Sequence, residues 1–219
     1  MHRSSLIVFA RPPLAGFAKT RLIPRLGAER AAKLYGAFLS DVCTVAAELD
    51  ARRVLAVAGD PAHASLASLP GLAGWQRTAQ VDGDLGQRMR AAIDSELTRA
   101  DRVCLVGSDA PTVPRAYLEQ AFLALVTHEV VIGPSTDGGY WLVGTRRAIP
   151  ELFNAMPWST PRVLVETLAK LRGRSVALLP FHYDVDEPAD LELLIRHLTI
   201  DASLAPHTRA ALEEAAILY

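Results

Sequence analysis

Val103-Cys-Leu-Val-Gly-Ser-Asp-Ala-Pro111 is the stretch that indicates the fold of this chain most directly. Its four apolar residues run into Gly107, Ser108 and Asp109, and Pro111, which has no backbone N–H, prevents the strand from continuing. An unbroken apolar run bounded by turn residues is typical of a strand buried on both faces of a parallel sheet. Ligands of open α/β sheets bind at the carboxyl ends of such strands. Asp109 is therefore either a carboxylate that holds a divalent cation or a ligand hydroxyl, or a turn residue before the proline.

Similar strands alternate with helical patterns along the whole chain. Short apolar or β-rich runs predict strands at 6–10, 53–58, 75–79, 103–106, 129–132, 140–144 and 175–179. Amphipathic or capped segments predict helices at 28–49, 61–69, 85–99, 114–126, 161–171, 188–197 and 206–217. The alternation predicts a three-layer α/β fold, a mostly parallel sheet with helices on both faces, in which 140–144 is an antiparallel edge strand. We expect residues 1–219 to form one domain, because no linker or internal repeat interrupts them.

The bulk composition limits the possible partners and locations. Half of the 219 residues are hydrophobic, and 23 basic and 24 acidic residues give a formal charge of −1. This balance provides no electrostatic footprint for nucleic acid or an anionic membrane. No apolar stretch approaches the roughly 20 residues that span a bilayer. Cys43 and Cys104 lack the spacing of a metal site, and buried free thiols suit a reducing compartment, so we expect a cytoplasmic protein.

A cationic loop follows the first predicted strand. It contains Arg11, Lys19 and Arg21, together with Gly16, where the backbone can approach a ligand closely. These residues predict an anion site, and the alternative is a solvated loop whose cations only face water. The loop lacks the Gly-Lys-Ser/Thr ending of a P-loop and the Gly-x-Gly-x-x-Gly pattern of dinucleotide sites.

Acidic residues follow two later strands. Asp137 comes after strand 129–132 and precedes two glycines, which indicate special backbone geometry or a close-packed neighbour. Asp184 and Asp186 follow the last strand. Because the carboxyl ends of parallel strands meet at one edge of a sheet, we expect these carboxylates to lie near Asp109.

The start of the predicted helix 85–99 has two interpretations. Asp84 and Gln87 have the spacing of a capping box, which by itself explains the local sequence. The alternative is that Gly83 and Gly86 form a small-residue surface bordering a ligand, with Arg88 available to contact it.

Two or more carboxylates together with Lys19 and Arg21 match the needs of a magnesium–diphosphate ligand. Mg²⁺ takes one or two protein carboxylates, keeps several waters and binds phosphate oxygens. The two cations would neutralise the remaining phosphate charge. A metal-free acid–base enzyme could use the same carboxylates but would not need Lys19 and Arg21. A serine nucleophile is not indicated, because Ser108 does not lie in a Gly-x-Ser-x-Gly elbow.

Five motifs in order give the chain a resemblance to a known family. They are Pro13-x-x-Gly16-x-x-Lys19-Thr20-Arg21-Leu22, Gly83-Asp-Leu-Gly-x-Arg-Met89, Gly107-Ser-Asp-x-Pro111, Gly133-Pro-x-x-Asp-Gly-Gly-Tyr140 and Asp184-x-Asp-x-Pro188-x-Asp-Leu191. With these motifs the chain resembles bacterial GT-A-like nucleotide-diphospho-sugar transferases, some of which are described as arsenosugar-biosynthesis glycosyltransferases. The resemblance extends to about Leu194. The family usually has Lys where Arg11 stands, a change that keeps the charge but alters the donor geometry.

The resemblance implies roles for particular residues. It implies a nucleotide bound over the loop of the first strand, by Arg11, Gly16, Lys19, Arg21, Gly86, Arg88 and Ser108. Asp109 matches the metal-binding carboxylate of GT-A transferases, Asp186 is similar to the second metal ligand of related sugar-nucleotide synthetases, and Asp184 is a further candidate. The segment Asp137, Gly138, Gly139 and Tyr140 would lie near the acceptor or the sugar.

We therefore expect a transferase that uses Mg²⁺ (or Mn²⁺) and passes a glycosyl group from a nucleotide-diphospho-sugar to a small acceptor. Its catalytic residues would be Lys19, Arg21, Asp109 and Asp137, the last as acceptor-side base. The first alternative is a nucleotidylyltransferase that joins an NTP to a sugar phosphate or another phosphorylated small molecule, because Lys19-Thr-Arg21 resembles triphosphate-binding loops. The second is a nucleotide-binding module without turnover. Trp141 and segment 149–158 could supply an apolar contact for a homo-oligomer.

Overall fold

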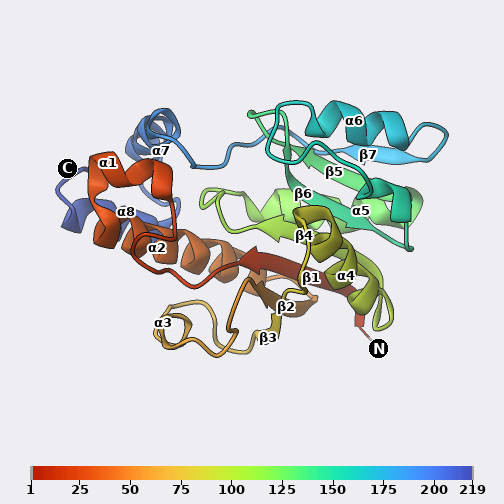
Figure 1. Cartoon of the computed structure of the whole chain (residues 1–219), viewed down its shortest axis with the longest axis horizontal. Helices are drawn as coiled ribbons and strands as arrows, with labels where there is room; N and C mark the ends of the chain where they lie inside the picture. Colours follow the sequence, from red (N-terminus) through yellow and green to blue (C-terminus); the bar gives the residue numbers. More distant parts are fainter. Residues whose placement is uncertain (1, 219) are drawn as a thin grey trace.

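The computed structural model describes residues 2–218, which are built around a seven-stranded sheet of order β3-β2-β1-β4-β6-β5-β7 (Figure 1). β6 pairs antiparallel with β4 and β5, and every other pairing in this sheet is parallel. The predicted mostly parallel α/β sheet is confirmed. The strands are β1 (His2–Ala10), β2 (Arg52–Val57), β3 (Gln76–Ala79), β4 (Ala100–Gly107), β5 (Val130–Pro134), β6 (Tyr140–Thr145) and β7 (Val176–Leu178).

Helices cover both faces of the sheet, which gives the three predicted layers. One face packs against α2 and α5, and the other packs against α4 and α6. A third apolar cluster packs α1, α7 and α8 against the part of α2 that contains Ala31, Leu34 and Phe38, at the left of Figure 1. The helices are α1 (Ile23–Leu26), α2 (Ala28–Ala47), α3 (Ala64–Ala67), α4 (Leu85–Leu97), α5 (Arg115–Thr127), α6 (Val163–Lys170), α7 (Pro188–Ile200) and α8 (Pro206–Glu214). No helix within residues 2–218 is both long enough and apolar enough to cross a membrane.

The central strands are buried on both faces, as their unbroken apolar sequences predict. Leu6, Ile7 and Val8 of β1 are fully buried, and so are Val103 and Val106 of β4. The segment 103–106 thus lies within β4, beside β1 in the middle of the sheet.

The predicted position of strand 140–144 at an edge of the sheet is wrong. β6 lies between β4 and β5, so both of its sides are paired. Trp141, Leu142 and Val143 are all buried, because helices cover both faces of this strand. A continuous apolar run is typical of a central strand, and this signal is stronger than the glycines that precede it. The edges are β3 and β7.

The predicted helix 61–69 is a single turn, α3, because proline and glycine residues bound it closely on both sides. At the other end of the chain, α8 is fixed by a side chain of α2. The carboxylate of Asp41 accepts hydrogen bonds from the backbone N–H groups of His207 (3.0 Å) and Thr208 (2.7 Å). These donors lie in the first turn of α8, where backbone N–H groups have no partner within the helix.

The segment after β7 returns to the carboxyl end of β4. Its backbone pairs with the loop after β5 through Ser135 and His182, and the N–H of Val185 donates to the carbonyl of Asp109 at 2.9 Å. This return brings Asp184 and Asp186 to the loop that follows β4, although the strands β4 and β7 are far apart in the sheet.

Candidate active site

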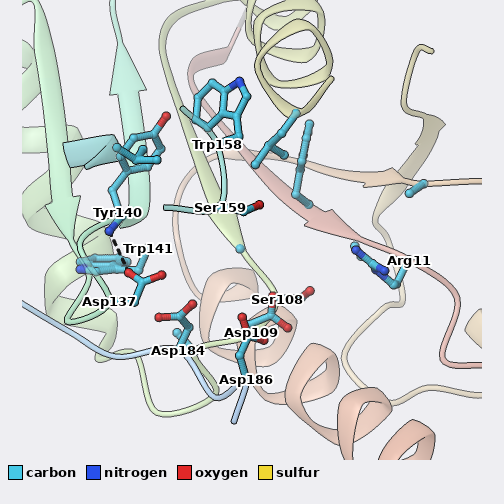
Figure 2. A pocket seen from close by; sticks show the side chains of 18 of the residues that line it. Arg11, Ser108, Asp109, Asp137, Tyr140, Trp141, Trp158, Ser159, Asp184 and Asp186 are labelled. Atoms are coloured by element: carbon cyan, nitrogen blue, oxygen red, sulfur yellow. Dashed lines mark hydrogen bonds between the residues drawn. The ribbon is translucent and has the colours of Figure 1, made fainter. Parts of the chain in front are cut away.

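A cavity of about 750 Å³ opens where β1 and β4 end. The loops after β1, β4, β5 and β7, the start of α4 and the segment before α6 all contribute to its wall. Figure 2 shows the four aspartates of this wall gathered near one another, with Arg11 across from them. The lining residues that the sequence indicated are Arg11, Lys19, Arg21, Arg88, Ser108, Asp109, Asp137, Gly139, Tyr140, Asp184 and Asp186.

Lys19 is the centre of the polar end of the cavity. Its side chain is only 4% exposed, and its ammonium forms ion pairs with Asp109 and with Asp186, the latter at 2.6 Å. Burial alone would lower the pKa of Lys19, but the two carboxylates raise it above its ordinary value. The backbone of Lys19 is left-handed (φ 48°, ψ 49°), which costs a non-glycine residue about 1–2 kcal/mol.

Tyr35 of α2 ties the loops of β1 and β4 together. Its hydroxyl accepts a hydrogen bond from the backbone N–H of Arg11 (3.0 Å) and pairs with the hydroxyl of Ser108 (2.9 Å). Burial, together with the negative charge of Asp109, raises the pKa of Tyr35 to about 12. The apolar stripe of α2 gave no signal for this role, because a tyrosine at helical spacing is most simply a core residue. The contact also engages the Ser108 side chain, which was expected to bind the nucleotide.

Asp184 and Asp137 form the second acidic part of the wall. Ser135 donates a hydrogen bond to Asp184, and the backbone N–H of Gly139 donates to Asp137 at 2.8 Å. Burial, with the neighbouring charges of Asp137 and Asp186, raises the pKa of Asp184 to about 6. The polar end of the cavity therefore carries more carboxylates than cations in contact with them, an environment that suits a divalent cation.

The donor set fits a metal ion that is bound jointly with a ligand. Within residues 2–218, no three His, Cys, Asp or Glu side chains gather closely enough to hold a metal by themselves. Asp109 and Asp186, however, both reach one ammonium group, so their carboxylates converge on one small volume. Mg²⁺ commonly uses one or two carboxylates and completes its shell with waters and phosphate oxygens. The site suits this type of coordination rather than an all-protein cage.

Replacing Asp184 with Asn is expected to stabilise the protein more at about pH 7.5 than at about pH 4.5, in buffer with EDTA. A carboxyl with a raised folded-state pKa stabilises the fold below its unfolded pKa and loses that contribution as the pH rises through about 6. The difference between the two pH values should be about 2 kcal/mol of unfolding free energy, measured by urea denaturation. Asp94→Asn, a surface change on α4, should show no such dependence. Equal effects of Asp184→Asn at both pH values would contradict this account.

Gly86 was predicted to lie near the nucleotide, but it is not among the residues that line the cavity. It is buried, and a Cβ there would lie 2.5 Å from the carbonyl oxygen of Phe153 and 2.7 Å from the ring of Trp158. The glycine therefore lets α4 pack against the segment that carries Trp158. The capping box of Asp84 and Gln87 is present as the sequence predicts.

Trp158 is a cavity residue that sequence reasoning missed. Its ring meets that of Tyr140 edge-on, with centroids 6.4 Å apart, and both rings line the cavity (Figure 2). The hydroxyl of Tyr140 is buried and has no hydrogen-bond partner among residues 2–218, so it is the ring of Tyr140 that faces the cavity. Only the tight fit at Gly86 points to Trp158, and this fit cannot be read from sequence.

Gly86→Ala is expected to destabilise the protein by about 1–3 kcal/mol in urea denaturation, because the added methyl group overlaps a backbone oxygen and the Trp158 ring. Gly107→Ala is the matched control. Its methyl group would meet nothing closer than 4.0 Å, so a change within about 0.5 kcal/mol is expected. Equal destabilisation by both substitutions would refute the close packing described for Gly86.

Gly16 and Gly138, which the sequence predicted to lie near a ligand, have backbone conformations that favour glycine. Gly16 is exposed with a positive φ of 81°, and nothing lies within 4 Å of the place where its Cβ would be. Gly138 has a φ of 88°, and a Cβ there would lie 2.3 Å from the carbonyl oxygen of Pro161. Neither lines the cavity, and Gly138 instead allows the turn after β5 to pack against the segment that begins α6.

Most of the apolar side chains predicted to contact another copy of the chain are buried, so the homo-oligomer stays a prediction. Trp141 is buried, and so are Ile149, Leu152, Phe153 and Met156 of the segment 149–158. Trp141, Ile149, Leu152 and Phe153 pack within the two clusters that cover the sheet.

A smaller cavity of about 240 Å³ adjoins the first at Ala58, Gln80 and Arg88. Gln80 is fixed by hydrogen bonds to the carbonyls of Ala10 (3.2 Å) and Ala56 (2.9 Å), and its amide oxygen faces Arg88 at 3.5 Å. Gln80 thus presents a fixed polar group beside Arg88. It follows the edge strand β3, whereas the β5–β6 turn lies toward the other edge of the sheet. Sequence reasoning identified Arg88 here but not Gln80.

The family described as "Uncharacterized protein conserved in bacteria (DUF2064)" matches residues 41–160. The chain belongs to this family. It is also 32% identical to a candidate nucleotide-diphospho-sugar transferase from Desulfovibrio desulfuricans G20, whose crystal structure matches 98% of this chain and 95% of that one with a TM-score of 0.89. The resemblance to a bacterial GT-A-like family is confirmed. None of the curated proteins matches the sequence.

More distant solved structures share the fold of this DUF2064 member. One is CMP:2-keto-3-deoxy-manno-octonic acid synthetase complexed with CTP, 14% identical, with 91% of this chain and 99% of that one covered and a TM-score of 0.57. Another is a Mycobacterium tuberculosis H37Rv protein in complex with manganese, 21% identical, with 88% and 97% covered and a TM-score of 0.56. At these identities the likeness extends to the fold.

Proposed function

We propose that this protein is a transferase that binds the diphosphate of a nucleotide-diphospho-sugar in the cavity and passes the glycosyl group to a small acceptor. The observation that carries the proposal is the meeting, in one cavity, of a cationic loop after β1 and carboxylates after β4 and β7. The relative from D. desulfuricans, described as a candidate nucleotide-diphospho-sugar transferase, supports the same donor.

The residues divide into a phosphate side and an acceptor side. Asp109 and Asp186, with Asp184 nearby, would hold Mg²⁺ or Mn²⁺, which would neutralise charge on the diphosphate. Lys19 and Arg21 would bind phosphate oxygens and stabilise the charge of the departing nucleoside diphosphate. The manganese in the related M. tuberculosis structure supports the use of a divalent cation.

Asp137 would be the base that accepts the proton of the acceptor hydroxyl. One of its oxygens is held by the N–H of Gly139, which fixes the orientation of the carboxylate in the cavity wall. Tyr140 and Trp158 would form an aromatic wall beside the transferred sugar or the acceptor. The small cavity at Gln80 and Arg88 would receive the base or ribose.

A second candidate is a nucleotidylyltransferase, favoured by the shared fold with the CTP-bound synthetase and by the loop containing Lys19 and Arg21. Release of nucleoside diphosphate from a nucleotide-sugar would support glycosyl transfer. Release of pyrophosphate from an NTP and a phosphorylated small molecule would support the second candidate. Nucleotide binding that survives Asp109→Ala, with no turnover even in the native protein, would instead support a binding module.

The first test is thermal stabilisation across a panel of nucleotides and nucleotide-sugars, with and without Mg²⁺ or Mn²⁺. A ligand at a hundred times its dissociation constant should stabilise the fold by about 2.7 kcal/mol. The stabilisation should require, or be increased by, the divalent cation. No stabilisation by any nucleotide would overturn all three alternatives.

We also propose a cytoplasmic location. The structure has Cys43 and Cys104 free and buried, and burial raises the pKa of both thiols, which therefore stay protonated. Free thiols are typical of a reducing compartment.

A further inference from the structure

Lys19 contacts the groups proposed to bind the metal, although its own proposed role is to bind phosphate. Its ammonium lies between the Oδ1 atoms of Asp109 and Asp186. Arg21, the neighbouring cation of the same loop, is 65% exposed and pairs with Glu187 at the rim. The two cations of the loop therefore differ in burial and in partner. Lys19 is buried and pairs with Asp109 and Asp186, whereas Arg21 is exposed and pairs with Glu187.

A divalent cation held by Asp109 and Asp186 would compete with the ammonium of Lys19 for these two carboxylates. Mg²⁺ binds carboxylate oxygens at about 2.0–2.1 Å, so a cation held by both side chains would lie close to the ammonium that they now contact. Two positive groups cannot share that position without strong repulsion in a site of reduced dielectric. Metal binding at these carboxylates therefore competes with the present position of Lys19.

We infer that Lys19 is a built-in counter-cation that couples metal binding to phosphate binding. It neutralises Asp109 and Asp186 until a phosphate group of the ligand draws the ammonium into the cavity and the divalent cation takes its place. The inference rests on the proposed function, because it requires a ligand that carries phosphate. It goes further in stating that the metal binds only weakly to the protein alone.

The burial of Lys19 explains why the exchange needs a phosphate. If a metal displaced the ammonium in the absence of any anion, a buried charge would lose both of its partners, which is strongly destabilising. The rings of Tyr35 and Phe38, whose centroids lie 5.9 and 5.7 Å from the ammonium, are too weak a substitute for two carboxylates. A phosphate would replace both lost ion pairs in a single step.

The local chain is suited to this movement. Lys19 lines the cavity, so its ammonium can turn toward a ligand there without crossing the core. Its four-carbon stem is flexible, whereas an arginine would hold the carboxylates in a rigid two-pronged contact.

The test is a Mn²⁺ titration of the whole protein without nucleotide, followed by electron paramagnetic resonance of free Mn²⁺. Lys19→Met, which keeps the stem and removes the charge, should bind Mn²⁺ at least about tenfold more tightly than the native protein, equivalent to about 1.4 kcal/mol. Arg21→Met is the matched control from the same loop and should bind like the native protein. Lys19→Met/Asp109→Asn should lose the gain, because it lacks one of the two carboxylates.

A second measurement uses the native protein alone, so the outcome does not depend on the folding of Lys19→Met. Thermal melting should rise little with Mn²⁺ or pyrophosphate added separately, and by more than the sum of both shifts when they are added together. Equal Mn²⁺ affinity of the native protein and Lys19→Met, or additive shifts with Mn²⁺ and pyrophosphate, would overturn the inference.

These outcomes are separate from those of the nucleotide panel. If no nucleotide stabilises the protein but Lys19→Met gains Mn²⁺ affinity, the role of Lys19 stands and the proposed donor is wrong. If nucleotides bind and Lys19→Met gains nothing, only the inference about Lys19 fails.

Discussion

Asp109→Asn is expected to lower turnover at least about a thousandfold. The amide keeps the size of the side chain but removes the charge that would bind the divalent cation and that now pairs with Lys19. Losing one electrostatic contact to a transition state typically costs a factor of 10²–10³, and loss of the metal adds to this. The measurement is kcat/KM in whichever reaction, nucleoside diphosphate release or pyrophosphate release, the native protein catalyses.

Asp94→Asn is the control, since it removes the same charge from a surface pair on α4 and should leave turnover within about twofold. Thermal melting checks that both variants fold. If folded Asp109→Asn kept a tenth or more of the native turnover, Asp109 would not be a metal ligand, and its role would be that of a turn residue before Pro111.

Much of this site could be predicted because it follows from topology. The apolar run 103–106 indicated a buried strand, and parallel strands place their following loops at one edge of a sheet. These two facts predict that Lys19 and Asp109 lie close together. The position of Asp186 after the last predicted strand predicts that it lies at the same edge, and the hydrogen bond from Val185 to the Asp109 carbonyl brings it to the loop after β4.

The errors and omissions concern residues whose role depends on a distant neighbour. Gly86 lies in the glycine-rich start of a capped helix, and only the three-dimensional contact with Trp158 shows why a side chain is excluded there. Tyr35 has the spacing of a core residue, and its hydroxyl gains a role from two loops that meet it in space. Local sequence patterns report periodicity and turns, so they carry no information about such contacts.

The same limit explains the misplaced strand β6. Its antiparallel direction was expected, but whether β5 pairs beyond it depends on the path of the chain after Pro134. The burial of the strand on both faces was nevertheless present in the sequence as an unbroken apolar run, Tyr140 to Val143. Such a run is typical of a strand inside a sheet, the position that β6 occupies.

Asp137→Asn is expected to distinguish the two catalytic proposals. Glycosyl transfer to a hydroxyl needs a base that accepts the hydroxyl proton, and loss of a positioned base typically lowers turnover by a factor of 10²–10⁴. Nucleotidyl transfer to a phosphate does not, because the attacking phosphate oxygen is already ionised. A loss of at least about a hundredfold in kcat is therefore expected if Asp137 is the acceptor-side base, with the KM of the donor nearly unchanged.

Asp137→Asn should change the chemistry without disturbing the fold or the proposed metal site. Asparagine keeps the oxygen that accepts the hydrogen bond from Gly139, so the turn before β6 should be preserved. Asp137 contacts neither Lys19 nor the pair of carboxylates around it, so donor and metal binding should survive the change. A folded Asp137→Asn variant that transfers a glycosyl group at the native rate would remove Asp137 from the chemistry. If the protein is instead a nucleotidylyltransferase, Asp137→Asn should lower kcat by less than about tenfold. The charge of Asp137 would then act only by its long-range electrostatic effect on the other groups of the site.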